Sequence, residues 1–135
     1  MDKFSPEKRS WLMSRIKGKN TSPEIRVRSL LHRLGFRFRI QRKDLPGKPD
    51  IVLPKYRVII FVHGCFWHQH QGCKSSHIPQ SNVSYWENKL SRNVLRDIKN
   101  KQDLEQLGWK VIVIWECETK NIEKLAEEIS EKIRN

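Results

Sequence analysis

Three cysteines and one histidine have the residue types and the spacing of a metal site. Cys65, His70 and Cys73 lie in one short segment, FVHGCFWHQHQGCKSSH, and Cys117 lies far downstream in IWEC. Three thiolates and an imidazole form a four-coordinate set typical of structural zinc, with no open position for catalysis. On spacing alone His68 could replace His70 as a ligand. The alternative of three unrelated buried thiols fits the clustered spacing poorly.

Two histidines of the same segment, His63 and His68, are not needed by that tetrahedron. Imidazole titrates near neutral pH, so both are candidates for a general acid or base. A histidine base needs an orienting partner, and Asp97 is a candidate for that role. An ion pair of Asp97 with Arg92 or Arg96 is the alternative. The segment therefore combines a metal scaffold with groups that can move protons.

A carboxylate at position 50 indicates a second metal. Asp50 follows Pro-Gly-Lys-Pro and begins an expected strand, where aspartate is disfavoured. A carboxylate close to a second strand end can hold Mg²⁺, which prefers hard oxygen ligands. A simple turn aspartate is the alternative. Glu24 also has two interpretations: it fits a capping box with Thr21, which the sequence favours, or it faces Asp50 and hydrogen-bonds a water on the metal.

The expected order of helices and strands predicts an α/β fold, in which a mixed β-sheet flanked by helices positions these groups. We expect helices over 5–16, 22–34, 83–107 and 121–133, and strands over 36–41, 50–53, 57–62 and 110–115. The segment 63–82 is expected to be a long loop, long enough to be functional. Trp109 and Trp115 flank the last strand and are expected in the core.

One face of the long helix carries an unusual mixture. Four residues within an arc of roughly 80° supply an aromatic ring, a cation, an amide and a carboxylate: Trp86, Lys89, Asn93 and Asp97. In the loop, Phe66 and Trp67 adjoin the metal ligands. Aromatic rings of a basic protein can stack on bases or wedge between base steps. A small core over the zinc is the alternative.

The charge and composition of the chain limit the kinds of partner that we expect. Lys and Arg number 27 against 15 Asp and Glu, a formal net charge of +12 over 135 residues, which favours a nucleic-acid partner over a membrane. There is no apolar run of about 18 residues and no signal-peptide core. An odd number of cysteines favours metal over disulfides. We therefore expect one cytoplasmic domain spanning 1–135.

Together these residues resemble the very-short-patch repair endonucleases, the strand-specific mismatch nickases called Vsr. The resemblance runs from about residue 6 to residue 117, through PGKPDIVL, FVHGCFWHQH with the following cysteine, NVLRD and GWKVIVIWEC. It implies a restriction-endonuclease-like fold with structural zinc and a Mg²⁺-dependent DNA endonuclease activity. The enzyme would nick 5′ to the thymine of a T:G mismatch, which arises by deamination of 5-methylcytosine, and so begin very-short-patch repair.

The resemblance also implies residue roles. Asp50 would ligate Mg²⁺ together with the backbone carbonyl of Val62, and Glu24 would bond a water on that metal. His68 would activate the attacking water, and Asp97 would orient His68. His63 would lie beside the scissile phosphate. Zinc would be held by Cys65, His70, Cys73 and Cys117. Phe66, Trp67 and Trp86 would wedge into the duplex, Met13 would enter from the opposite groove, and Lys89 and Asn93 would read the mispaired bases.

Two departures from the family pattern accompany the resemblance. Val62 stands where a family member has threonine, and one extra residue precedes Cys73, an insertion that Gly72 can absorb. There are two alternatives to this function. One is a nuclease of the same fold with another DNA target, and the other is a DNA-binding module held together by zinc. The expected partner is double-stranded DNA bound by a monomer. Further partners to consider are mismatch-repair proteins and, functionally, a cytosine-5 methyltransferase.

Overall fold

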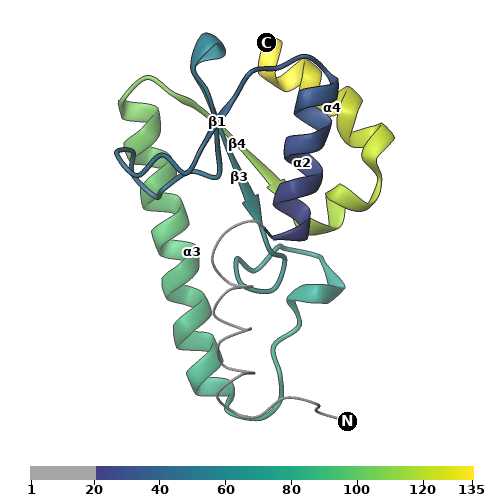
Figure 1. Ribbon diagram of the computed structural model, residues 1–135. Helices are drawn as coiled ribbons and strands as arrows, with labels where there is room; N and C mark the ends of the chain where they lie inside the picture. The colour runs from purple at the N-terminus through teal and green to yellow at the C-terminus, as the bar shows by residue number, and fades with distance from the viewer. Residues whose placement is uncertain (1–20) are drawn as a thin grey trace, which may run out of the picture.

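The computed structural model describes residues 21–135, and Figure 1 shows their path. The helix expected over 5–16, and Met13 within it, lie outside the described residues. Three helices and four strands follow in the order α2 (Ser22–Arg33), β1 (Arg39–Ile40), β2 (Ile51–Leu53), β3 (Val58–His63), α3 (Val83–Gln106), β4 (Lys110–Trp115) and α4 (Ile122–Arg134). Short 3-10 turns cover Pro54–Tyr56, Lys74–Ser76 and Glu116–Lys120. The expected α/β class is confirmed.

The four strands form one mixed sheet in the order β1-β2-β3-β4. β1 and β2 pair antiparallel, as do β2 and β3, whereas β3 and β4 pair parallel. The parallel register runs from Val58 opposite Lys110 to His63 opposite Trp115. Parallel neighbours need a long crossover, and here the segment 64–82 and α3 supply it. The carboxyl ends of β3 and β4 therefore meet at one edge of the sheet.

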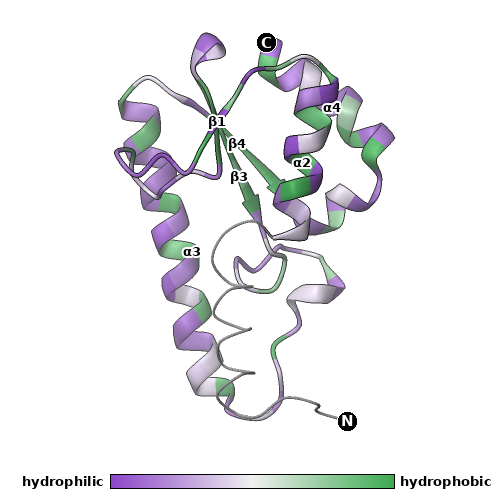
Figure 2. Cartoon of the chain, in the orientation of Figure 1, coloured by the Kyte–Doolittle hydropathy of each residue, from purple (hydrophilic) through white to green (hydrophobic). Residues whose placement is uncertain are grey.

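Helices cover both faces of the sheet (Figure 1). On one face α2 and α4 pack on strand residues that include Ile60, Ile112 and Ile114. On the other face Leu104 of α3 packs on residues that include Ile59 and Phe61. Successive strand residues point to opposite faces, so β3 and β4 are apolar along nearly their whole length. Figure 2 shows these apolar strands between helices whose outer faces are hydrophilic.

Local chemistry explains where the elements begin and end. The Thr21 side chain caps α2, and Gly35, at φ +86°, follows its last turn. The Asn121 side chain caps α4 by accepting a hydrogen bond from the backbone of Lys124. Within residues 21–135, no helix combines the length and the apolar character needed to cross a bilayer.

Two expected strands differ from those observed. The strand expected over 36–41 is reduced to Arg39–Ile40: Phe36 packs in the core, and Gln41 adopts a left-handed conformation at φ 58°, which ends the strand. The strand expected over 57–62 is displaced by one residue, because Arg57 adopts a left-handed conformation at φ 57°. The displacement brings His63 into β3 as its last residue.

Candidate active site and metal centre

The predicted metal ligands come together beyond the carboxyl ends of β3 and β4. Cys65, His70 and Cys73 lie in the loop that follows β3, and Cys117 lies in the 3-10 turn that follows β4. Their ligand atoms all lie within 4.8 Å of one another. The parallel pairing of the two strands explains this meeting, because it brings residues about 50 positions apart to the same edge.

The geometry of this cluster fits a tetrahedral ion. His70 Nδ1 lies 3.7 Å from Cys65 Sγ and 3.5 Å from Cys117 Sγ. Ordinary zinc–sulfur and zinc–nitrogen bonds at tetrahedral angles separate sulfur from nitrogen by about 3.6 Å. The cluster can therefore bind a metal ion without rearrangement, and three sulfurs with one imidazole suit zinc.

The surrounding backbone supports these ligands. His70 N donates to Cys65 O at 2.9 Å, and Cys65 N donates to the Glu116 carboxylate at 3.4 Å, which ties the loop to the turn after β4. Gly72 has φ +75°, a left-handed conformation that accommodates the extra residue before Cys73. Burial raises the pKa of the Cys65 thiol to about 12, so binding of a metal at this site must displace that proton.

Asp50 is held at the start of β2 by the neighbouring strand. Its Oδ2 accepts a hydrogen bond of 2.7 Å from the backbone N–H of Val62. Burial, with a smaller contribution from the nearby Glu24 carboxylate, raises the pKa of Asp50 to about 6. Two acidic groups in repulsion at a partly buried position fit a divalent cation, because a cation relieves both the burial cost and the repulsion. The metal-ligand role of Asp50 stays a prediction that this environment fits.

Glu24 combines parts of both of its interpretations. Its backbone N–H donates to Thr21 Oγ1 at 3.4 Å, which is half of a capping box. Its side chain is buried, lies 3.0 Å from Arg28 NH2 and acts on the charge of Asp50. The cap contact of Thr21 with Glu24 is thus observed, and the Glu24 side chain also lies near Asp50; a bond from Glu24 to a water on the metal stays a prediction. The Val62 group that touches Asp50 is its N–H; metal ligation by its carbonyl stays a prediction.

His68 and Asp97 form the closest polar pair of the site. His68 Nδ1 lies 2.6 Å from Asp97 Oδ2, so Asp97 pairs with this histidine and not with the neighbouring arginines. An ionised carboxylate can only accept, which places the proton on Nδ1 and leaves Nε2 as an acceptor. The pair has the arrangement of an oriented general base.

His63 lies against this pair. Its ring stacks on that of His68, with the ring centres 3.8 Å apart and the planes 6° from parallel. Burial, with a smaller contribution from His68, lowers the pKa of His63 to about 4, so His63 is neutral near pH 7. His63, His68 and Asp97 also offer ligand atoms within 4.8 Å of one another. Nitrogen lone pairs lie in the ring planes, however, and stacked parallel rings direct them side by side, which favours acid–base chemistry over shared metal binding.

The aromatic residues predicted to contact DNA form one group. The ring centres of Phe66, Trp67 and Trp86 lie 5.2 to 5.9 Å from one another. Lys89 Nζ lies 5.5 Å from the centre of the Trp67 ring. Asn93 Nδ2 donates to the backbone oxygen of Trp67 at 3.1 Å, which fastens the loop to α3. The stripe on α3 and the loop therefore act as one surface.

Three residues at the site were missed by the sequence interpretation. Tyr85 is 56% exposed and its ring lies 5.2 Å from Trp86, so it extends the aromatic group; its adjacency to Trp86 was the available signal. Glu116 contacts the backbone of Cys65. Trp115 is not among the core clusters of the described residues but contacts two histidine rings. Its expected place in the core is wrong.

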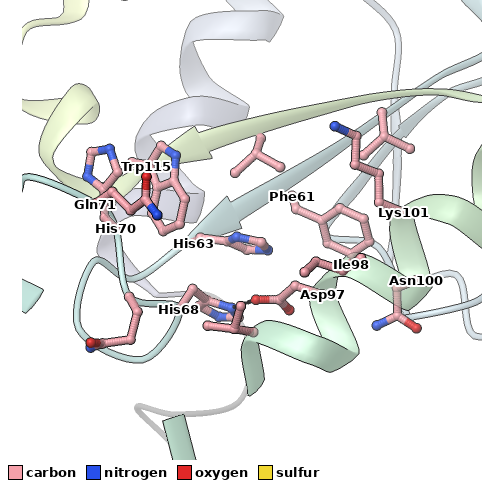
Figure 3. A pocket seen from close by; sticks show the side chains of 14 residues that line it. Phe61, His63, His68, His70, Gln71, Asp97, Ile98, Asn100, Lys101 and Trp115 are labelled. Carbon is pink, nitrogen blue, oxygen red and sulfur yellow. Dashed lines mark hydrogen bonds and ion pairs between the residues drawn. The ribbon is translucent and has the colours of Figure 1, made fainter. Parts of the chain in front are cut away.

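A cavity of about 460 Å³ opens beside the histidines, between α3, the sheet and the loop. Its walls include Phe61, His63, His68, Asp97, Ile98 and Trp115. Figure 3 shows the His63 ring between those of Trp115 and His68, with Asp97 reaching His68 from α3. Three of the catalytic candidates, His63, His68 and Asp97, thus line this cavity, whereas Asp50 and Glu24 are not among its lining residues.

The chain is similar to DNA endonucleases over most of its length. It is 50% identical over 121 residues to the type II nicking enzyme V.XorIIP of Xanthomonas oryzae, which covers 90% of this chain and 88% of the relative. It is 48% identical over 133 residues to the type II nicking enzyme V.NmeAIP of Neisseria meningitidis, covering 98% and 94%. With the DNA mismatch endonuclease Vsr of Escherichia coli it shares 42% identity over 120 residues, covering 89% and 76%. By class, the protein is a DNA endonuclease.

The family described as DNA mismatch endonuclease Vsr matches residues 1–74. This match spans more than half of the 135 residues and includes Asp50, both candidate catalytic histidines and the first three metal ligands. The chain belongs to the DNA mismatch endonuclease Vsr family. The predicted family and the DNA substrate are confirmed.

Proposed function

We propose that this endonuclease nicks one strand of a duplex 5′ to the thymine of a T:G mismatch, in a Mg²⁺-dependent reaction. The observation that carries the proposal is the His68–Asp97 pair at 2.6 Å, near the half-buried Asp50 at the same edge of the sheet. Relatives named as nicking enzymes and as a mismatch endonuclease support cleavage of a single strand at a mispair.

The chain's own groups divide the reaction between them. His68 Nε2 accepts the proton of the attacking water, while Asp97 holds the ring and stabilises its charged form. His63, kept neutral by burial, donates a hydrogen bond beside the scissile phosphate. Asp50 is the carboxylate ligand for Mg²⁺, the Val62 carbonyl is the second protein ligand, and Glu24 is an acceptor near them. When bound, Mg²⁺ supplies charge that stabilises the phosphate and the leaving oxygen.

Zinc has a structural role in this proposal. Its ligands are Cys65, His70, Cys73 and Cys117, which use all four positions of a tetrahedron. The zinc joins the loop after β3 to the turn after β4. It thereby fixes a loop that supplies catalytic and DNA-contacting residues but contains little regular structure of its own.

The aromatic group on the loop and α3 would recognise the mispair. Phe66, Trp67 and Trp86 would enter the duplex, and unstacking costs least at a mispaired step, which itself favours mismatched DNA. Lys89 and Asn93 lie beside these rings. The contact of Asn93 with Trp67 uses one amide hydrogen, so its oxygen and second hydrogen can serve a base. Met13 would insert from the opposite groove.

The wider proposal includes a restriction-endonuclease-like fold, with residues 1–135 as one domain. One active site per chain and one nicked strand suit a monomer. DNA as substrate suits a cytoplasmic place of action, with mismatch-repair proteins and a cytosine-5 methyltransferase as functional partners. A nuclease of the same fold with another DNA target is the second candidate. Two of the three relatives named above are called nicking enzymes, without mention of a mismatch.

A strand-resolved nicking assay tests the proposal. Duplexes that differ only in a T:G, T:A or C:G pair are labelled on either strand and incubated with Mg²⁺. We expect one cut, in the T strand of the T:G duplex, with wild type and with His77→Ala, an exposed histidine of the same loop. His68→Ala should bind the duplex but not cut it. Equal cutting of the T:A duplex would retain the nuclease and reject mismatch specificity.

A further inference from the structure

Trp115 and His63 occupy matched positions at the ends of the two parallel strands. The register pairs them directly, and both continue the strand positions that face α3. Their ring centres lie 5.3 Å apart, with the planes at 74°, so the edge of one ring meets the face of the other. The backbone N–H of Trp115 donates to the Glu118 carboxylate at 2.9 Å, which fixes the end of β4.

The same tryptophan also contacts a predicted zinc ligand. The ring of His70 stacks on Trp115, with centres 4.2 Å apart and planes 9° from parallel. On the far side, His63 stacks on His68 at 3.8 Å, and His68 contacts Asp97 at 2.6 Å. Figure 3 shows Trp115, His63 and His68 one after another. A continuous series of ring contacts therefore runs from the metal centre to the candidate general base.

The series lies along the side of the site that borders the cavity. Trp115, His63, His68 and Asp97 all line the cavity of about 460 Å³. A side chain that borders an open space lacks packing contacts on that side, so its orientation depends on the contacts it does make. His63 is 7% exposed, and its ring contacts among residues 21–135 are with Trp115, His68 and Phe61, the last with ring centres 5.7 Å away.

We propose that Trp115 is a positioning residue, which holds His63, and through it His68, in a fixed relation to the metal ligand His70. The inference rests on the proposed catalytic role of His68. Among residues 21–135, the ring contacts of Trp115 are with His63 and His70, and not with the group of Phe66, Trp67 and Trp86. Loss of its ring should therefore lower the rate of the chemical step and leave DNA binding unchanged.

The test compares Trp115→Leu with Trp115→Phe. Leucine removes the flat ring, and we expect single-turnover nicking to fall by about tenfold to a hundredfold, the loss typical when a catalytic group is displaced by about 1 Å. Phenylalanine keeps an aromatic face and should retain activity within a few-fold of wild type. The dissociation constant for the T:G duplex should be the same for all three proteins.

Trp109→Leu is the matched control. Trp109 precedes the same strand and is also half-buried, but its ring lies 4.5 Å from the Arg57 guanidinium, at the opposite end of β4. It should nick at the wild-type rate at a temperature where all variants are folded. Zinc content per chain should equal that of wild type in every variant, because no ligand is changed.

Histidine side-chain NMR supplies a readout that does not depend on activity. In zinc-loaded protein, Trp115→Leu should shift the ring signals of His63 and His68, whereas Trp109→Leu should leave them in place. Removal of zinc should shift the His63 signals in wild type and much less in Trp115→Leu, since the connecting ring is absent. A Trp115→Leu protein with wild-type rate and unshifted His63 signals would overturn the inference. If His68→Ala also retained full activity, the proposed function itself would fail.

Discussion

Replacing Asp50 by asparagine is expected to stabilise the Mg²⁺-free protein while it abolishes nuclease activity. The pKa of Asp50 is raised from its usual 3.8 to about 6 by burial. The folded protein therefore holds this proton up to about pH 6, whereas the unfolded chain releases it near pH 4. Stability from this group is fully present below pH 3.8 and is lost as pH rises through 6.

The size of the effect follows from that difference of about 2 pH units. Each unit corresponds to about 1.4 kcal/mol, so the ionised Asp50 costs about 3 kcal/mol of folding free energy above pH 6. Asparagine has the same shape, carries no charge and can accept the Val62 N–H hydrogen bond through its oxygen. Burial of its amide hydrogens costs about 1 kcal/mol. The expected net gain at pH 7.5 is about 2 kcal/mol.

Urea unfolding of zinc-loaded protein without Mg²⁺ measures this gain. The difference between Asp50→Asn and wild type should be about 2 kcal/mol at pH 7.5 and should shrink towards zero or below by pH 4. The lowered pKa of His63 removes stability as pH falls from 6.5 through 4, but both proteins carry His63, so its contribution cancels. Added Mg²⁺ should stabilise wild type and not the variant.

Asp44→Asn is the control for this measurement. Asp44 is exposed and paired with Arg42 at 2.6 Å, and the hydrogen bond from that arginine lowers the pKa of Asp44. Its replacement should give no stabilisation at pH 7.5. If Asp50→Asn were no more stable than wild type at pH 7.5, or if its advantage did not decline in acid, the buried-charge explanation would be refuted.

Three further predictions concern the metal centre, the histidine pair and the core. Cys117→Ser should lower bound zinc below one per chain by atomic emission, because it removes one of four ligands. Asp97→Asn should reduce single-turnover nicking by about 10²- to 10⁴-fold with unchanged DNA affinity, whereas Asp103→Asn, in an exposed pair of the same helix, should have no effect. Leu104→Ala should cost about 2–5 kcal/mol in urea unfolding and Leu95→Ala under 1, since Leu104 is fully buried and Leu95 is 66% exposed.

The metal cluster could be predicted from the sequence because its determinants are local. Cys65, His70 and Cys73 are close in the chain, and an apolar strand before Cys117 predicts that this cysteine meets them at a sheet edge. The pairing of His68 with Asp97 does not follow from the sequence, since Arg92 and Arg96 are equivalent charge partners for Asp97. The packing of α3 against the loop decides it.

Other features depend on packing that a linear pattern does not contain. The proximity of the Glu24 side chain to Asp50 depends on how α2 packs on the sheet. The role of Trp115 follows from the strand register, because its ring meets His63 only when the two strand ends are level. An apolar strand flanked by tryptophans predicts a core residue at that position. The presence of the cavity makes it a contact residue instead.

The most direct test of the central claim is the single-turnover rate of nicking on a T:G duplex as Mg²⁺ is varied. We expect wild type to cut the T strand at a rate that rises with the Mg²⁺ concentration and then saturates. Asp50→Asn and His68→Ala should bind the duplex as tightly but cut it at least about a hundredfold more slowly. Cutting by Asp50→Asn at the wild-type rate, with the same Mg²⁺ dependence, would contradict the assignment of this edge of the sheet as the active site.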